Sequence, residues 1–350
     1  MIKLEAWRFR EPLGPPLRRA AFAGIPVGGV FLLDIGLSAG ELTAVGTGAF
    51  FGGFVAFDSP SGRTRAIWQL GAAVPIAAGG LLGALTGSTP VLAVVTMFAL
   101  ATIAGITFAV SLRFYVAALN VTLALLIAQG LAPGPSDAWV IFLCGGAGVL
   151  LQAAFSLVAA LADRIREEID ARQGIAIVRV RVRESLTLDA IAFRHALRFG
   201  GALAAGVAVY SVVDLGPHGY WVPMTILFVL RPSHDQTWER IAMRAAGTFL
   251  GLLLATPLAS LIGGLDLLEA LAIGVTAALS WALLAIEYAL FTTAITSFAV
   301  IIAHTFGQPA VAAAGERALA TVIGLAIVAV AYFAFRDRPE SVQATGVATG

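Results

Sequence analysis

Charged residues are scarce in this sequence. Of its 350 residues only 12% are Asp, Glu, Lys or Arg, whereas 59% are hydrophobic. Soluble domains carry about 25% charged residues, so the composition indicates a polytopic membrane protein. The formal net charge is only +1, which gives no electrostatic reason to expect a nucleic-acid partner.

Cysteine and sequence motifs of catalysis are also scarce. The single cysteine, Cys144, lies in an apolar run, and one cysteine excludes both an intramolecular disulfide and a cysteine-rich metal site. The sequence contains neither a Walker Gly-x-x-x-x-Gly-Lys nor a His-Glu-x-x-His. We therefore expect no ATP-driven pump within this chain, no enzyme, and no cofactor or metal.

What the chain has in abundance is apolar length. A bilayer core needs about 20 residues of helix to cross it, and twelve apolar runs approach that length. The first has a basic flank but no small-x-small cleavage site, so we interpret it as a retained helix and not a signal peptide. The eighth is short, which predicts a tilted, half-buried or broken helix. The runs are 18–37, 41–57, 66–87, 90–110, 113–131, 137–162, 196–214, 219–231, 240–263, 266–286, 287–306 and 311–335. We predict an all-α membrane protein of about twelve transmembrane helices.

The distribution of charge predicts the orientation of these helices. If the N-terminus is cytoplasmic and sides alternate, the cytoplasmic segments contain all of the 22 Lys and Arg residues except Arg317. The outer segments then carry only acids: Asp34, Glu41, Asp137, Asp214, Asp266 and Glu269. This one-sided pattern follows the positive-inside rule. It predicts an even number of helices and places both termini in the cytoplasm.

A polar stretch at 163–195 divides the chain. It begins with a charged, helix-like run and continues at 175–183 with apolar residues and arginines in alternation, which is typical of an extended segment. It is either a basic stripe on the membrane surface or an ordinary basic cytoplasmic loop. We predict four parts: a six-helix membrane unit at 1–162, a short basic cytoplasmic connector at 163–195, a second six-helix membrane unit at 196–335, and a cytoplasmic tail at 336–350.

The two membrane units look like repeats. The third run of each unit carries Gly-x-x-x-Gly, at Gly79/Gly83 and at Gly247/Gly251, a spacing that lets helices approach closely. The short second run of each unit ends before Pro-Ser. Because six is an even number, both units would enter the membrane from the same side, which predicts parallel repeats related by an axis along the membrane normal.

The stretch 221–251 carries a resemblance to a known family. It contains two apolar segments joined by a short basic hairpin, with Trp221, Pro223, Thr225, Arg231-Pro232, Thr237, Arg240, Arg244, Gly247-Thr248 and Gly251 in order. This pattern resembles the signature of the fusaric-acid-resistance (FUSC) proteins of the aromatic acid exporter group. Residues 193–198 and 317–324 are similar to the family as well. The first unit departs from the signature, with Asp58-Ser59-Pro60 in place of Arg-Pro, and the connector replaces a larger domain found in many of these exporters.

The resemblance implies efflux of small organic acids across the bacterial inner membrane, aromatic carboxylates being the favoured class. The lack of a nucleotide motif points to the proton gradient as the driving force. Two alternatives stay open. One is a passive anion channel, since the family resembles more distantly the plant aluminium-activated malate transporters; the other is a non-transporting scaffold or envelope-biogenesis factor. The expected partners are a small organic anion and the lipid bilayer, and the sequence leaves open whether the protein is a homo-oligomer.

Ionisable residues inside a membrane are costly, so each is a functional candidate. A guanidinium pairs well with a carboxylate, and the candidates for substrate binding are Arg317, Trp221, Thr225, Arg231, Arg240 and Arg244. The candidates for proton coupling are Glu316, Glu287 and His304. Each candidate also has a structural alternative. Glu316 and Arg317 could form an interfacial ion pair, Glu287 could cap a helix, and His304 could have a purely structural role. Trp221 could belong to the aromatic belt, and the hairpin arginines could serve only to fix the topology.

Overall fold

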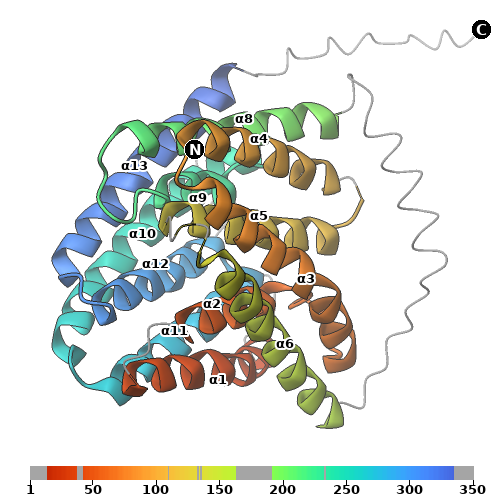
Figure 1. The fold of residues 1–350 in the computed structure, drawn as a ribbon, viewed down its shortest axis with the longest axis vertical. Helices are drawn as coiled ribbons and strands as arrows, with labels where there is room; N and C mark the ends of the chain where they lie inside the picture. Colours follow the sequence, from red (N-terminus) through yellow and green to blue (C-terminus); the bar gives the residue numbers. More distant parts are fainter. Residues whose placement is uncertain are drawn as a thin grey trace, which may run out of the picture.

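The computed structural model describes residues 14–37, 42–108, 110–131, 134, 136–162, 191–231 and 234–334. These residues form twelve α-helices (Figure 1). The helices are α1 Gly14–Leu37, α2 Leu42–Phe54, α3 Gly62–Thr86, α4 Pro90–Thr107, α5 Leu112–Leu131, α6 Ala138–Ala162, α8 Ile191–Val212, α9 Trp221–Val229, α10 His234–Ile262, α11 Asp266–Ile286, α12 Tyr288–Thr305 and α13 Ala310–Ala334.

The all-α prediction is confirmed for the described residues, and each of the twelve apolar runs corresponds to one helix. Nine helices in the described part of the chain are long and apolar enough to cross a membrane. Helix α2 has 13 residues and α9 has only 9, so the expected short eighth helix is present. Helix α8 begins at Ile191 and not at residue 196. The remainder of the predicted connector, with its extended segment, and the tail lie outside the described residues.

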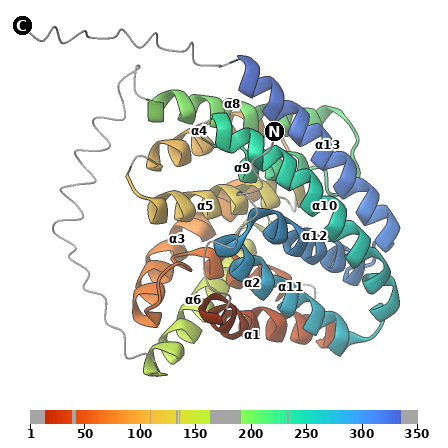
Figure 2. The ribbon, with the colours of Figure 1, turned by 180° about the vertical axis from the view of Figure 1, so that it is seen from behind.

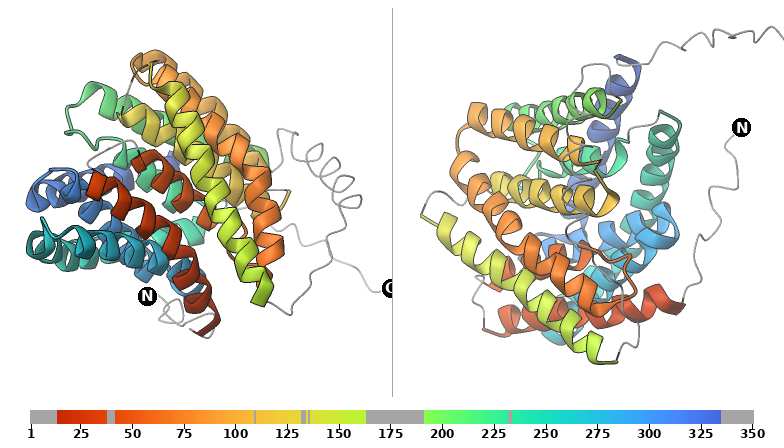
Figure 3. Two further views of the ribbon diagram at one scale, coloured as in Figure 1. Left: turned by 60° about the horizontal axis from the view of Figure 1, so that its bottom comes forward. Right: turned by 90° about the vertical axis from the view of Figure 1, so that its right-hand side faces the viewer.

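Two helix pairs join the first and second halves of the chain. Helix α1 packs against α11 at one end of the molecule, and α4 packs against α8 at the opposite end (Figures 1 and 2). Between these pairs, α3, α5 and α6 lie on the first-half side, and α10, α12 and α13 on the second-half side (Figure 3). Each half therefore shares two broad contacts with the other.

Within each half the long helices approach closely at glycines. A Cβ atom added at Gly83 of α3 would lie 2.3 Å from the Leu125 carbonyl oxygen of α5. One added at Gly247 of α10 would lie 2.3 Å from the Ala289 carbonyl oxygen of α12. Only glycine allows such backbone contact, which replaces the missing hydrophobic drive between helices in lipid. The expected close approach at these glycine pairs is confirmed.

The short helix α9 is the most enclosed element. Eight of its nine residues are buried, and it packs against α13 and α8. Its last residues turn out of the helix before Pro232, which cannot donate a backbone hydrogen bond. In contrast, α4 directs Val91, Val95 and Phe98 outward, as expected for a face in contact with lipid.

Candidate functional site: buried arginines in the second half

Two arginines lie fully buried inside the second half. Arg244 is the eleventh residue of α10 and Arg317 the eighth residue of α13, and both side chains are 0% exposed. At 1.5 Å per residue they lie about 15 Å and about 10 Å from the first residue of their helices. Helices α10 and α13 pack together, and the two guanidinium groups lie within range of each other's charge.

Neither guanidinium makes a hydrogen bond of ordinary geometry to a described nitrogen or oxygen, although the Tyr288 side chain is a polar neighbour of Arg244. All three nitrogens of Arg244 are buried without such a bond, and so are Nε and Nη2 of Arg317. The remaining Arg317 nitrogen, Nη1, lies 3.8 Å from the Met224 sulfur, which is only a weak acceptor. A buried charge normally requires a partner, because desolvation costs several kcal/mol.

Aromatic faces supply the other contacts of these two groups. The Arg317 guanidinium carbon lies 5.1 Å from the ring centroid of Trp221, and that of Arg244 lies 5.7 Å from the ring centroid of Phe228. Both rings belong to α9. Cation–π contacts of this kind are worth about 2 kcal/mol when desolvated, which offsets only part of the burial cost. The short helix α9 thus places aromatic rings beside both cations.

A second basic group lies toward the start of α10. The Arg240 guanidinium lies 4.1 Å from the ring centroid of Tyr288, and its Nη1 is 3.5 Å from the Phe228 carbonyl oxygen. The Tyr288 hydroxyl donates to the same carbonyl at 3.0 Å. The carbonyl of Arg231 accepts hydrogen bonds from Arg198 Nη2 and Thr237 Oγ1. Arginines therefore extend from this hairpin to the buried pair.

The buried carboxylates of the described residues are engaged elsewhere. Asp34 accepts hydrogen bonds from Leu42 N and Thr43 Oγ1, and Glu269 accepts one from Gly264 N. Glu287 caps the start of α12 by accepting from Leu290 N at 2.9 Å. Each of the three therefore closes a turn or a helix end. For Glu287 this is the capping alternative, although the side chain is only 6% exposed.

Glu316 does not pair with its neighbour Arg317. Its Oε2 lies 2.9 Å from His218 Nδ1, and its Oε1 accepts from Gln308 Nε2 at 2.6 Å. The His218 ring stacks on Trp221, with ring centroids 4.4 Å apart. His218 thus lies between the Glu316 carboxylate and the indole that contacts Arg317. No pattern in the sequence marks His218, because a histidine in a loop carries no signal of its own.

The other predicted residues fall into packing roles or lie apart. Trp221 is 3% exposed, so the aromatic-belt interpretation is wrong. The Thr225 hydroxyl donates to the Trp221 carbonyl, and its side chain packs beside Gly324. His304 Nδ1 lies 2.9 Å from the Gln308 carbonyl oxygen at the end of α12. Tyr220, just before α9, is buried.

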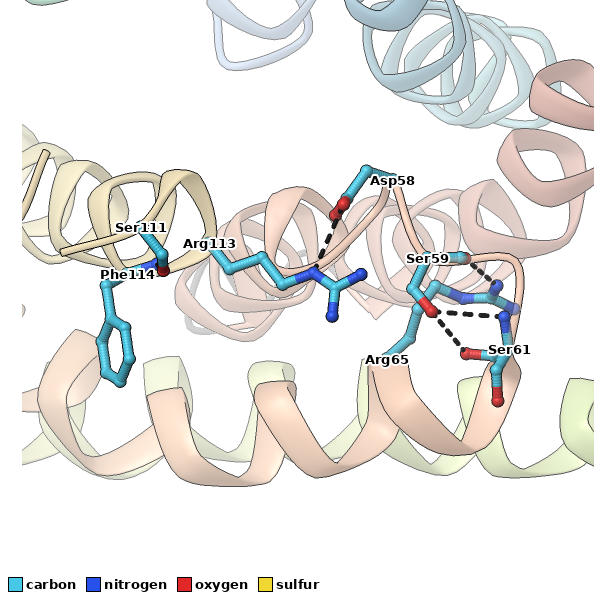
Figure 4. A network of polar contacts seen from close by, with 7 residues as sticks. All are labelled: Asp58, Ser59, Ser61, Arg65, Ser111, Arg113 and Phe114. Carbon is cyan, nitrogen blue, oxygen red and sulfur yellow. Dashed lines mark hydrogen bonds and ion pairs between the residues drawn. The ribbon is translucent and has the colours of Figure 1, made fainter. Parts of the chain in front are cut away.

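The corresponding hairpin of the first half has a different arrangement (Figure 4). Arg113 of α5 reaches Asp58 at 3.3 Å, an exposed ion pair. Arg65 Nη1 donates to the Ser59 carbonyl at 2.8 Å and lies 3.2 Å from that of Pro60. The basic groups of this hairpin therefore bind parts of the hairpin itself.

The described residues contain no group of three His, Cys, Asp or Glu side chains close enough to hold a metal. Residues 36–40 spell Gly-x-Ser-x-Gly, the pattern of a hydrolase nucleophile elbow. That elbow requires a strand before the serine, and here the preceding residues form the last turns of α1. The pattern is therefore not a nucleophile elbow.

The family can now be stated. Residues 187–331 match the model of the fusaric acid resistance protein-like family. The second half of this chain is therefore similar to that family. The match covers the buried arginines, the aromatic helix α9 and the hairpin, so the resemblance identified from 221–251 is confirmed. Together with the nine helices of the described residues that are long and apolar enough to cross a membrane, this match supports a membrane protein.

Two relatives match about half of this chain. An uncharacterised protein of Synechocystis is 34% identical over 161 residues, which are 45% of this chain and 21% of that protein. The inner membrane protein YccS of Escherichia coli is 29% identical over 180 residues, 50% of this chain and 25% of that protein. The matched regions thus span about a fifth to a quarter of these relatives. No solved structure matches this chain.

Proposed function

We propose that this chain exports small organic acids, aromatic carboxylates above all, across the bacterial inner membrane. The observation that carries the proposal is the buried pair Arg244 and Arg317, two cations without acidic partners beside the rings of Trp221 and Phe228. A guanidinium binds a carboxylate with two parallel hydrogen bonds, and an aromatic ring packs well on indole and phenyl faces. The relationship to an inner membrane protein supports the location.

The arginines also outline a path. Substrate would approach from the cytoplasm past Arg231 and Arg240, bind at Arg244 and Arg317, and leave toward the end of α13 that carries Glu316. Partly exposed cations draw anions by long-range attraction, whereas buried ones bind them. Thr225 would serve this site by packing α9 against α13, and Trp221 by facing the ring of the substrate.

Proton coupling would use the acid beside this exit. Glu316 and His218 form a hydrogen-bonded pair with Gln308 and Trp221 around it. An imidazole and a carboxylate in direct contact can pass a proton between them, so this pair is the proposed proton carrier. Asp214, which accepts from Gly216 N, is the other acid of the same loop. Glu287 and His304 stay candidates as well. Glu287 caps α12 with Oε2, whereas its Oε1 is buried without a partner, and His304 contacts the Gln308 carbonyl.

The deciding experiment measures export from cells loaded with a panel of aromatic and aliphatic acids. Cells expressing the wild type should accumulate less of at least one aromatic acid, and a protonophore should cancel the difference. Arg317→Gln should lose export at equal expression. Arg63→Gln, which removes an exposed charge at the start of α3, should keep it. Export that ignores both the protonophore and Arg317→Gln would overturn the proposal.

A passive anion channel is the second candidate, since basic residues extend from the hairpin toward the middle of the membrane. It predicts anion current through a planar bilayer that persists without a proton gradient. Such a current, reversing at the equilibrium potential of the anion, would favour the channel over the exporter. A scaffold would show neither current nor export.

A further inference from the structure

The number of uncompensated charges in the site carries information about its ligand. Four arginines are buried in the described part of the chain: Arg65, Arg198, Arg244 and Arg317. The first two donate to backbone carbonyls. Arg244 and Arg317 alone combine complete burial with nitrogens that have no partner. The site therefore holds two unbalanced positive charges.

Neither charge can be removed by other means. A guanidinium stays protonated in proteins, so the two groups cannot neutralise themselves as a buried lysine would. The buried carboxylates Asp34, Glu269 and Glu287 already cap turns and helix ends. Balance must come from the occupant of the site.

We propose that the ligand is an aromatic dianion, a ring that carries two ionised acidic groups. This inference rests on the proposed function and names its substrate class. A monoanion would compensate one guanidinium and leave the other buried with its desolvation penalty of several kcal/mol. A dianion compensates both. The two rings of α9, Trp221 beside Arg317 and Phe228 beside Arg244, lie next to the cations and would border the part of the ligand between its charged groups.

The first test compares two ligands of nearly equal size on the purified protein in detergent at neutral pH and low salt. Benzene-1,3-dicarboxylate is a dianion, and its monomethyl ester is a monoanion with the same ring. Calorimetry should show the dicarboxylate binding at least about tenfold more tightly, since close charge pairs in protein complexes contribute more than 1.4 kcal/mol. Equal affinity would overturn the inference, and so would tighter binding of the ester.

The second test changes the protein. Arg244→Gln and Arg317→Gln each leave one cation, so the ratio of the two affinities should fall to about one in either variant. Arg244→Lys and Arg317→Lys keep the charge and should preserve the preference for the dianion. A ratio unchanged by Arg→Gln would overturn the inference even if both ligands bind. Thermal melting of each variant shows whether it is folded. The comparison of the two ligands on the wild type does not depend on any variant.

Two further measurements complete the test: sulfate binding shows whether the aromatic ring contributes, and the export assay distinguishes failure of this inference from failure of the proposed function. Sulfate is a dianion without a ring and should bind at least about tenfold more weakly than the dicarboxylate; equal binding would overturn the aromatic assignment. If the cells export monoacids with no preference for dianions, the dianion inference fails and the exporter stands. If the purified protein binds none of the anions and the cells export none, both fail.

Discussion

At the residue scale, a buried arginine without an acid is a cost that only function justifies. Arg317 contacts Trp221 and the Met224 sulfur, which do not balance its charge. Replacing buried ionic groups with apolar residues of similar volume often stabilises a protein by about 1–4 kcal/mol. We therefore expect Arg317→Met to raise the melting temperature of the purified, ligand-free protein while it abolishes export.

The control for that prediction is Arg198→Met. Arg198 is also buried, but its Nη2 donates to the Arg231 carbonyl at 2.8 Å. Losing that bond leaves a buried carbonyl with less hydrogen bonding, which costs about 1–3 kcal/mol. Arg198→Met should thus lower the melting temperature. If Arg317→Met lowers it equally, Arg317 has a structural partner and the anion site is wrong.

His218 provides a pH-dependent prediction at the same scale. If the His218–Glu316 pair handles the proton, the export rate of the wild type should depend on pH. His218→Gln keeps a polar side chain that cannot carry a proton, so its export rate should lose that dependence. Binding of the dicarboxylate at neutral pH should stay within about twofold of wild type, because the arginines remain.

The comparison for this pH profile is His304→Gln, which should keep the wild-type slope. A sloped profile in His218→Gln that is lost in His304→Gln would transfer the proton role to His304. If the export rate of both variants still depends on pH, neither histidine carries the proton. Glu316→Gln, which removes the acid of the pair, then tests Glu316.

How far single residues could be predicted depends on whether the sequence marks them. The charge of Arg317 within an apolar run marks it, and so do Arg240 and Arg244 in the family signature. The direction of Glu316 follows from helix geometry, since neighbouring residues differ by about 100° around the axis. What no pattern in the sequence reveals is His218, because its position depends on how the loop before α9 folds back against α13.

At the element scale, glycine contacts hold the long helices together. The sequence predicted where these contacts occur but could not identify the partner helices. Gly-x-x-x-Gly indicates a surface for close approach without naming what approaches. The structure assigns Gly83 to α5 and Gly247 to α12. The short α9 was predictable from its length, whereas its position between α8 and α13 was not.

Two glycines of α3 test this account of helix packing. A Cβ at Gly83 would lie 2.3 Å from the Leu125 carbonyl oxygen, whereas a Cβ at Gly71 meets nothing within 4 Å. Overpacking of a close contact costs about 1–3 kcal/mol, so Gly83→Ala should lower the melting temperature by several degrees. Gly71→Ala should be neutral or slightly stabilising, because alanine favours the helix. Equal effects of both substitutions would contradict the contact.

At the scale of the whole molecule, the helix contacts support two six-helix repeats. Gly79 and Gly83 meet Val121 and Leu125, and the residues 168 positions later repeat the pattern, as Gly247 and Gly251 meet Ala289 and Thr293. If the halves are repeats, α1 corresponds to α8 and α4 corresponds to α11. The contacts of α1 with α11 and of α8 with α4 are then equivalent, as a two-fold axis between the halves would require. In the same register Arg244 corresponds to Ile76, so the proposed anion site lies in one half only.

Parallel repeats and the positive-inside pattern together predict a topology that can be measured. Asp214 and Arg63 are both exposed, and the proposed orientation places them on opposite sides of the membrane. In a Cys144→Ser background, Asp214→Cys should react with a membrane-impermeant maleimide added to intact spheroplasts. Arg63→Cys should react only after the membrane is permeabilised. The reverse labelling would invert the molecule, direct the arginine path outward and turn the proposed exporter into an importer. Labelling of both cysteines in intact spheroplasts would show that an even number of spans lies between them. The proposed arrangement has five spans there, so this result would contradict the repeat architecture.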